Sequence, residues 1–467
     1  MRSGGLPAKA VLGRIPDGTD HEAGERSIRL LIVALRAAAG LLLAALVLFS
    51  PLRGQDEPGP GEGLTVKAIR LEGLNRTKAY VVTRELVSRV GAPHRGENVA
   101  KDITRLEKLD IFVDIQVEAT VEGSEVVLTY RFVEILKFLP SLGLQITDEN
   151  GVSVGLGVKV PNVRGRDTSF SGRVMGGGSA LAQVVVQNPW FAGNRIGYSL
   201  EYYYRNRENL LADFLETSHE FALELSAPVG EYFRFGGRLE YQDIRSDTDG
   251  ATLDPDNQDQ VTRMGFYLSY ERKDAYVGPH KGWYAEARLA RELRIFESSS
   301  QFTQLDLDVR RYQPLPFGDR HTLMITTLLT LRTGVPGTDL ASWQMFGLGG
   351  TNTVRGWDYA SRIGKNQLIG TLEYTYTLLK PRLVALPFRL RYRGGLQVCV
   401  FADAGTVWDD GPAFSGETLI AGWGIGLRLL VPIVGVVRFD LAWGSGNGGQ
   451  FHVGAYEKAV MARRRVR

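Results

Sequence analysis

Residues 305–310 read LDLDVR, a stretch in which apolar and charged residues alternate without interruption. In an extended strand the leucines and the valine lie on one face, and the aspartates and the arginine lie on the other. A soluble sheet buries its apolar face in a core, whereas a membrane barrel turns that face to lipid and its polar face to the lumen. The stretch therefore predicts a strand of one of these two kinds.

The same alternation recurs through residues 135–456, for example in YSLEYYY at 198–204, FALELS at 221–226 and AEARL at 285–289. The segments are about ten residues long, the length with which a tilted strand crosses a bilayer. Tyr and Trp recur near their ends, as in the aromatic girdles of membrane barrels. We count about sixteen segments, an even number that such barrels favour. We therefore predict a transmembrane β-barrel of about 16 antiparallel strands.

Composition excludes several classes of function. The net charge of +3 over 467 residues is too small to indicate nucleic-acid binding. The single cysteine, Cys399, allows no intramolecular disulfide, and we interpret it as a small strand residue rather than a nucleophile. None of the six histidines has the spacing of a metal ligand set. We expect no enzymatic activity, no cofactor and no metal.

The chain ends do not have the pattern of folded structure. Arg26, Arg29 and Arg36 precede an apolar run at 37–49, the order of a secretory signal, so residues 1–54 are interpreted as a signal region. A membrane anchor at 30–49 is the alternative, although Arg36 inside a span is costly. Residues 55–63, which contain PGPG, are interpreted as a linker. Residues 457–467 form a basic tail.

Residues 64–134 differ from the rest, because helical and strand patterns both occur there. The pattern predicts a strand at 64–71, followed by a helix from Thr77 through Val82, Leu86 and Val90. A second helix follows around Val99, Ile103 and Leu106, and two strands come next, at 111–120 and 125–133. This order, with VKAIRLEGLNRTKAYVVTREL and LEKLDIFVDIQVE, resembles one α+β POTRA domain. That resemblance implies a domain that holds unfolded chains by adding them to a sheet edge. The alternative is a generic α+β spacer.

Residues 347–359 read GLGGTNTVRGWDY, with four glycines and Arg355 between two predicted strands. No strand–loop–helix context surrounds this segment, so a phosphate-binding loop is discounted. The segment resembles the V-R-G-aromatic loop of the outer-membrane assembly and two-partner-secretion superfamily, the BamA/TamA-like surface-antigen barrels. The resemblance implies that the loop follows the eleventh strand and folds back into the barrel. It also implies that the arginine contacts acidic and aromatic residues of the inner wall, so the candidate site comprises Val354, Arg355, Gly356, Trp357, Glu373, Phe401 and Asp403.

Alternation supports this set independently of the resemblance. If Leu372 faces lipid, then Glu373 faces the lumen, and if Val400 faces lipid, then Phe401 and Asp403 face the lumen. One loop arginine would therefore meet two carboxylates and an aromatic ring. The alternative is that each charge is an independent, solvated lumen residue.

The resemblance implies assembly or translocation of proteins at the outer membrane, with the small domain in the periplasm. Partners would be unfolded outer-membrane or secreted polypeptides and outer-membrane lipid, and periplasmic accessory proteins are further candidates. The alternatives are a two-partner secretion pore with a dedicated substrate, a lipid-handling barrel and a passive structural barrel. A single POTRA-like unit weighs against the secretion pore, whose members usually carry two. The basic tail after Tyr456 departs from the aromatic terminus usual in the family.

Overall fold

The computed structural model describes residues 60–456, apart from 192–193, 275–277, 294, 296–297, 386–390, 411–417, 432–434 and 445–447. The predicted signal region at 1–54, most of the linker at 55–63 and the basic tail at 457–467 lie outside the described residues. The interpretations of these three segments therefore stay predictions. None of the helices in the described part of the chain is both long and apolar enough to cross a membrane.

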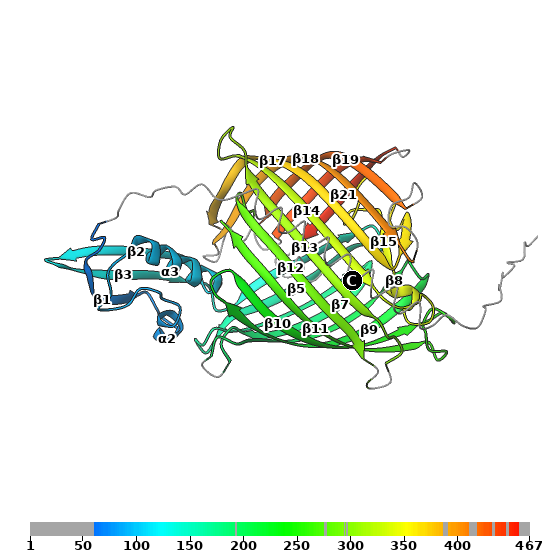
Figure 1. Ribbon diagram of the computed structural model, residues 1–467, viewed down its shortest axis with the longest axis horizontal. Coiled ribbons are helices and arrows are strands. Elements are labelled where there is room, and N and C mark those ends of the chain that lie inside the picture. Colours follow the sequence, from blue (N-terminus) through cyan, green and yellow to red (C-terminus); the bar gives the residue numbers. More distant parts are fainter. Residues whose placement is uncertain are drawn as a thin grey trace, which may run out of the picture. The chain divides into compact units, whose positions relative to one another are not determined.

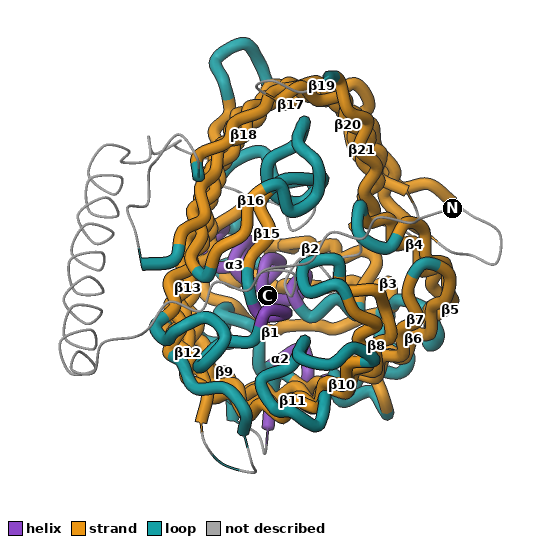
Figure 2. Tube along the Cα trace, turned by 90° about the vertical axis from the view of Figure 1, so that its right-hand side faces the viewer, coloured by secondary structure: helices purple, strands orange, loops and turns teal. Residues whose placement is uncertain are grey.

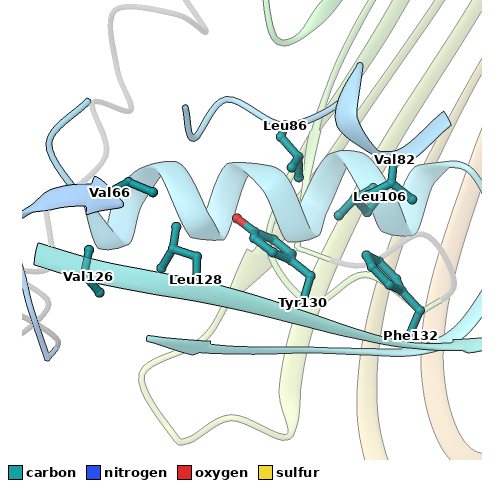
Figure 3. Packing of buried hydrophobic residues seen from close by; sticks show 8 residues of the cluster. All are labelled: Val66, Val82, Leu86, Leu106, Val126, Leu128, Tyr130 and Phe132. Carbon is teal, nitrogen blue, oxygen red and sulfur yellow. The ribbon is translucent and has the colours of Figure 1, made fainter. Parts of the chain in front are cut away.

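The small domain has the predicted order of strand, helix, helix, strand and strand (Figure 1). Its elements are β1 (Thr65–Glu72), α2 (Ala79–Thr83), α3 (Gly96–Lys108), β2 (Phe112–Glu122) and β3 (Glu125–Glu134). The sheet order is β1-β3-β2, with β1 parallel and β2 antiparallel to the central strand. The two helices and this sheet enclose one apolar core, which Figure 3 shows. The core consists of Val66, Val82, Leu86, Leu106, Val126, Leu128, Tyr130 and Phe132.

The first helix is shorter than the sequence predicts. We expected it to extend to Val90, but α2 ends at Thr83, and this part of the prediction was wrong. The carboxylate of Asp102 on α3 is fully buried and accepts hydrogen bonds from the backbone N–H groups of Val87 and Ser88. Because a side chain from another element satisfies these donors, the backbone does not need to continue as a helix there.

Thr77 begins the predicted helix and, as a threonine, is a candidate for its N-cap, but the structure does not give it that role. The N-cap is Lys78, which makes no side-chain capping hydrogen bond. The backbone N–H of Thr77 instead donates to Glu134 at 2.7 Å, so its position is fixed by the end of β3. The sequence pattern alone could not distinguish a helix cap from a residue that binds the end of β3.

Among the described residues, sixteen antiparallel strands form the second sheet, which confirms the predicted fold class and number. Figure 2 shows these strands arranged as a ring. In chain order they are β4 (Leu139–Thr147), β5 (Gly151–Val163), β6 (Thr168–Gly177), β7 (Ser179–Asn188), β8 (Gly197–Asn209), β9 (Phe214–Val229), β10 (Phe233–Ser246), β11 (Gln258–Lys273), β12 (Gly282–Leu293), β13 (Thr303–Pro314), β14 (His321–Arg332), β17 (Asn366–Ala385), β18 (Arg391–Trp408), β19 (Leu419–Val431), β20 (Gly435–Gly444) and β21 (Gly449–Tyr456). Each strand pairs with its sequence neighbours, and the ring of strands surrounds a lumen.

Apolar and charged side chains separate onto the two faces of this sheet. On β9, Phe221 and Leu225 are exposed on the outer face, whereas Glu220 lies on the lumen side. There it meets Arg238 of β10, which also contacts Glu201 of β8, at 3.1 Å and 2.7 Å respectively. Charges thus pair with one another inside the barrel, and apolar groups face outward to lipid.

The ends of the sheet, β4 and β21, lie side by side without joining (Figure 2). Within the described residues no ladder of backbone hydrogen bonds connects them, so each is an edge strand. We call this boundary the seam.

A long segment, residues 333–365, follows β14, the eleventh barrel strand in chain order, as the family resemblance implied. It carries the short strands β15 (Phe346–Leu348) and β16 (Arg362–Gly364), which pair with each other. Figure 2 shows them inside the ring of strands. We call residues 350–357, between β15 and β16, the loop tip.

Candidate functional site: the lumen anchor of the loop tip

Two glycines allow the loop tip to approach the barrel wall closely. Gly356 has φ +86°, a left-handed conformation that side chains other than glycine rarely adopt. A Cβ atom at Gly356 would lie 2.5 Å from the backbone nitrogen of Gly444 on β20, and one at Gly444 would lie 2.3 Å from the Gly356 oxygen. Backbone therefore packs directly on backbone, and this contact fixes the neighbouring Arg355 against the wall.

Arg355 binds Asp403 of β18 through three donors. Its Nε lies 2.6 Å and its backbone nitrogen 3.2 Å from Oδ2, and its Nη2 lies 2.9 Å from Oδ1. Thr371 of β17 donates its hydroxyl to the same carboxylate at 2.9 Å. The side chains of Arg355 and Asp403 are 4% and 1% exposed, so this paired fork is almost entirely removed from water.

The remaining nitrogen of the guanidinium reaches two further carboxylates. Nη1 lies 3.3 Å from Glu373 of β17 and 3.1 Å from Asp440 of β20. The plane of the group lies over the ring of Phe401, with Cζ 3.3 Å from the ring centroid. Only a planar cation can combine ring stacking with such a set of hydrogen bonds.

Arg428 of β19 supplies a second cation to the cluster. Its Nη2 lies 2.8 Å from Glu373, and its Nη1 donates to Asp440. Arg438 lies 3.8 Å from Asp440 and adds a third positive charge. Three cations thus face the three carboxylates, so removal of one partner leaves buried charge without compensation.

Glycines on β19 make the space that this cluster occupies. A Cβ atom at Gly422 would lie 2.0 Å from the backbone oxygen of Arg355. At Gly424 it would lie 2.6 Å from the Phe401 ring, and at Gly426 2.1 Å from Asp440. The face of β19 beneath the loop tip therefore has to consist of backbone alone.

Val354 and Trp357 flank the arginine on the loop tip. Val354 is fully buried in an apolar cluster with Leu348 of β15 and Ile420 of β19. The indole Nε1 of Trp357 donates to the backbone oxygen of Ala421 at 2.8 Å. These contacts attach both sides of the loop tip to the wall at β19.

The structure thus brings all seven predicted site residues together at one place in the lumen. Sequence reasoning did not include Asp440 or Arg428 in the site. The signal was present, because VVRFDLAWG at 436–444 alternates and turns Arg438 and Asp440 inward. Alternation gives the face of each residue but not its partner across the lumen.

Family comparisons agree with this architecture. The profile of the Omp85 superfamily domain matches residues 162–455, more than half of the chain. The chain belongs to the Omp85 superfamily. Residues 64–134 match the POTRA profile, described as a surface antigen variable number repeat. Membership of the Omp85 superfamily places the barrel in the outer membrane, with the POTRA domain on its periplasmic side, as predicted.

Individual relatives are distant. The outer membrane protein assembly factor BamA of Neisseria meningitidis serogroup B is 22% identical, over 75% of this chain and 47% of the relative. This Omp85 chain therefore spans about half the length of that curated relative. Among solved structures, BamA from Haemophilus ducreyi lacking POTRA domains 1–3 matches with TM-score 0.58 and 17% identity, over 84% of this chain and 85% of that one. CdiB from Escherichia coli matches with TM-score 0.54 and 13% identity, over 93% and 98%.

Proposed function

We propose that this Omp85 protein inserts client polypeptides into the outer membrane by strand addition at the seam, without enzymatic chemistry. The observation that carries the proposal is that β4 and β21 lie side by side but, over their described residues, are not joined by a ladder of backbone hydrogen bonds. Unpaired backbone groups in a lipid environment each cost several kcal/mol. An incoming strand would satisfy them, so the seam is the natural template for a client strand.

The lengths of the two edge strands support this proposal. β21 has eight residues and β4 has nine, whereas β9 and β11 have sixteen each. Fewer residues offer fewer backbone hydrogen bonds, so any pairing between these edges would be weak compared with the ladders of the long strands, such as β10–β11. A client strand therefore competes with little existing structure.

The POTRA domain offers a second edge for an extended client. Part of the outer edge of β1 is covered, because Val66 exchanges backbone hydrogen bonds with Gly91 and Ala92. In the described part of the chain no backbone hydrogen bond reaches the outer edge of β2. We infer that β2 is the edge on which an unfolded outer-membrane or secreted polypeptide adds as a strand before it reaches the barrel.

Contacts among the distal loops favour insertion over export through the lumen. The distal end is the one at which β4, β10, β12 and β14 finish, opposite the end where the POTRA domain connects. There Trp343 donates to Asp259 at 2.7 Å, and Ser342 donates to the oxygen of Ala251 at 3.1 Å. The long loop after β14 is thereby bonded to the β10–β11 loop. The same loop lies inside the ring of strands, so an exported chain would have to pass it, whereas a strand added at the seam would not cross the lumen (Figure 2).

Disulfide locking of the seam tests the proposal. One cysteine replaces Leu144 of β4, and a second is placed in turn at each position from 449 to 453 of β21. The matched control joins Leu239 to Met264, which are directly opposed in the β10–β11 ladder. The assay is insertion of an unfolded outer-membrane barrel protein into liposomes that contain the oxidised or the reduced variant.

We expect oxidation across the seam to abolish insertion, because the crosslinked edge strands cannot separate to pair with a client strand. Reduction should restore insertion. The control disulfide should leave insertion unchanged, since that ladder is already paired. Full insertion by a protein whose seam is quantitatively crosslinked would refute the proposal.

A further inference from the structure

One residue of the loop tip contacts both sides of the seam. The hydroxyl of Thr351 lies 2.7 Å from Oδ1 of Asp148, in the turn between β4 and β5, and 3.0 Å from Nδ1 of His452 on β21. The backbone N–H of Thr351 also donates to Asp148. Where the structure describes them, the first hairpin and the last strand have no backbone ladder between them, yet both are hydrogen-bonded to this one threonine.

We propose that Thr351 is a clamp that holds the seam closed at the distal end of the resting barrel. The clamp consists of Asp148, Thr351 and His452. This conformational device goes beyond the proposed client insertion, because it concerns the barrel with no client present.

The donors and acceptors of the clamp can be assigned along the whole chain of hydrogen bonds. The backbone N–H of Gly356 donates to Nε2 of His452 at 3.0 Å, so in the neutral ring the proton is on Nδ1. Nδ1–H then donates to the Thr351 hydroxyl, whose own hydrogen donates to the Asp148 carboxylate. Each donor and acceptor is used once, and this assignment of the tautomer follows from the network.

Both sides of the clamp are attached to the barrel wall. Glu149, next to Asp148, lies 3.1 Å from Arg207 of β8, and Arg207 in turn lies 3.0 Å from Glu216 of β9. On the other side, Arg438 of β20 donates to the backbone oxygen of Thr351. The clamp therefore connects two parts of the wall, in addition to ordering the loop.

Burial makes the central contacts strong. Thr351 is 2% exposed and His452 is 5% exposed, whereas 29% of the Asp148 side chain remains exposed. A hydroxyl buried between two partners loses both of them if the edges separate, and water cannot easily replace them. Separation of the seam at this end therefore requires that the loop tip release either Asp148 or His452.

Distance measurement across the seam tests the clamp in the full-length protein. Spin labels are placed at Leu142 of β4 and Phe451 of β21, both exposed on the outer face at 54% and 67%. Cys399 is buried, and protein without added cysteines reports any labelling at that position. The distance distribution is measured by pulsed electron resonance in phosphatidylcholine liposomes with no client.

The test variant is Thr351→Val, which keeps the shape but removes the hydroxyl. Its matched control is Thr353→Val, whose hydroxyl accepts from the Gly349 N–H at 2.8 Å and donates to the Gly349 oxygen at 2.7 Å, both within the same loop. If Thr351→Val does not fold, Asp148→Ala removes the clamp from the opposite side. Folding is checked by heat-modifiable migration on a gel.

We expect Thr351→Val or Asp148→Ala to shift the distribution to longer distances and to broaden it, and Thr353→Val to match the parent. An unchanged distribution in the folded clamp variants would overturn the proposal. A shift of equal size in Thr353→Val would also overturn it, because the effect would then come from general loosening of the loop. The measurement uses no client, so its result is independent of the proposed insertion activity.

Discussion

The guanidinium of Arg355 donates to both carboxylate oxygens of Asp403, with Nε 2.6 Å from Oδ2 and Nη2 2.9 Å from Oδ1. This geometry joins the loop tip to β18, and a third contact through the backbone nitrogen of Arg355 fixes the turn as well as the side chain. Because the pair is buried, removal of one partner lowers stability by more than formation of the intact pair raises it.

Replacement of Arg355 by alanine should release the loop tip. It leaves Asp403 without its cation, and loss of one partner of a buried pair costs about 3–5 kcal/mol. Lysine should not restore the parent, because it lacks the planar fork that meets Asp403 and stacks on Phe401. The free energy of unfolding and proteolysis of residues 333–365 measure these effects.

A double-mutant cycle provides the control for this prediction. If the two side chains interact, Arg355→Ala combined with Asp403→Ala should be no less stable than the worse single variant. Additive losses in the unfolding free energy would contradict the assignment of Arg355 and Asp403 as partners.

The glycines of β19 should be sensitive to a single methyl group. Gly426→Ala would place a Cβ atom 2.1 Å from Asp440 and 2.9 Å from the Cys399 sulfur, and overpacking of this kind costs about 1–3 kcal/mol. Gly370→Ala on β17 is the matched control, because its Cβ atom would meet only the Ala404 oxygen, at 4.0 Å. An equal decrease in melting temperature in both variants would contradict this prediction. The loss of stability would then come from replacing any strand glycine, and not from the lack of space beneath the loop tip.

Acidification should weaken the contribution of Asp148, which lies in a turn outside the strands. Burial raises the pKa of this carboxyl, but the nearby His452 ring and hydrogen bonds from Thr351 outweigh burial and hold the pKa at about 2, below the ordinary 3.8. A depressed pKa stabilises the fold fully above the ordinary value, and this stabilisation is lost as the pH falls through 3.8 towards 2. The melting temperatures of the parent and of Asp148→Asn should therefore differ at pH 6 and converge near pH 2. A difference that is constant over this range would contradict the assigned contacts.

Deletion of residues 64–134 should leave a folded but inactive barrel. The POTRA core is built from its own helices and sheet, and the sixteen-stranded sheet contains no strand from this region. The truncated protein should therefore retain heat-modifiable migration on a gel while client insertion is lost. Full insertion activity after deletion would exclude the proposed role of β2 as a client edge.

The alternating pattern by itself determined which side chains face the lumen. Leu372 and Val400 are exposed on the outer face, and Glu373 and Asp403 are buried on the inner face, as alternation predicted. The physical reason is local, because successive residues of a strand point to opposite faces whatever the partner strand is. The number of strands followed in the same way from the spacing of the segments.

Tertiary structure decided the contacts that depend on a partner far away in the chain. The helix predicted through Val90 ends at Thr83 because Asp102, on another element, takes over the backbone donors. Thr351 is separated from Asp148 by 203 residues and from His452 by 101. No local pattern encodes such a contact, since it exists only when closure of the barrel brings the first hairpin, the loop tip and the last strand to one place.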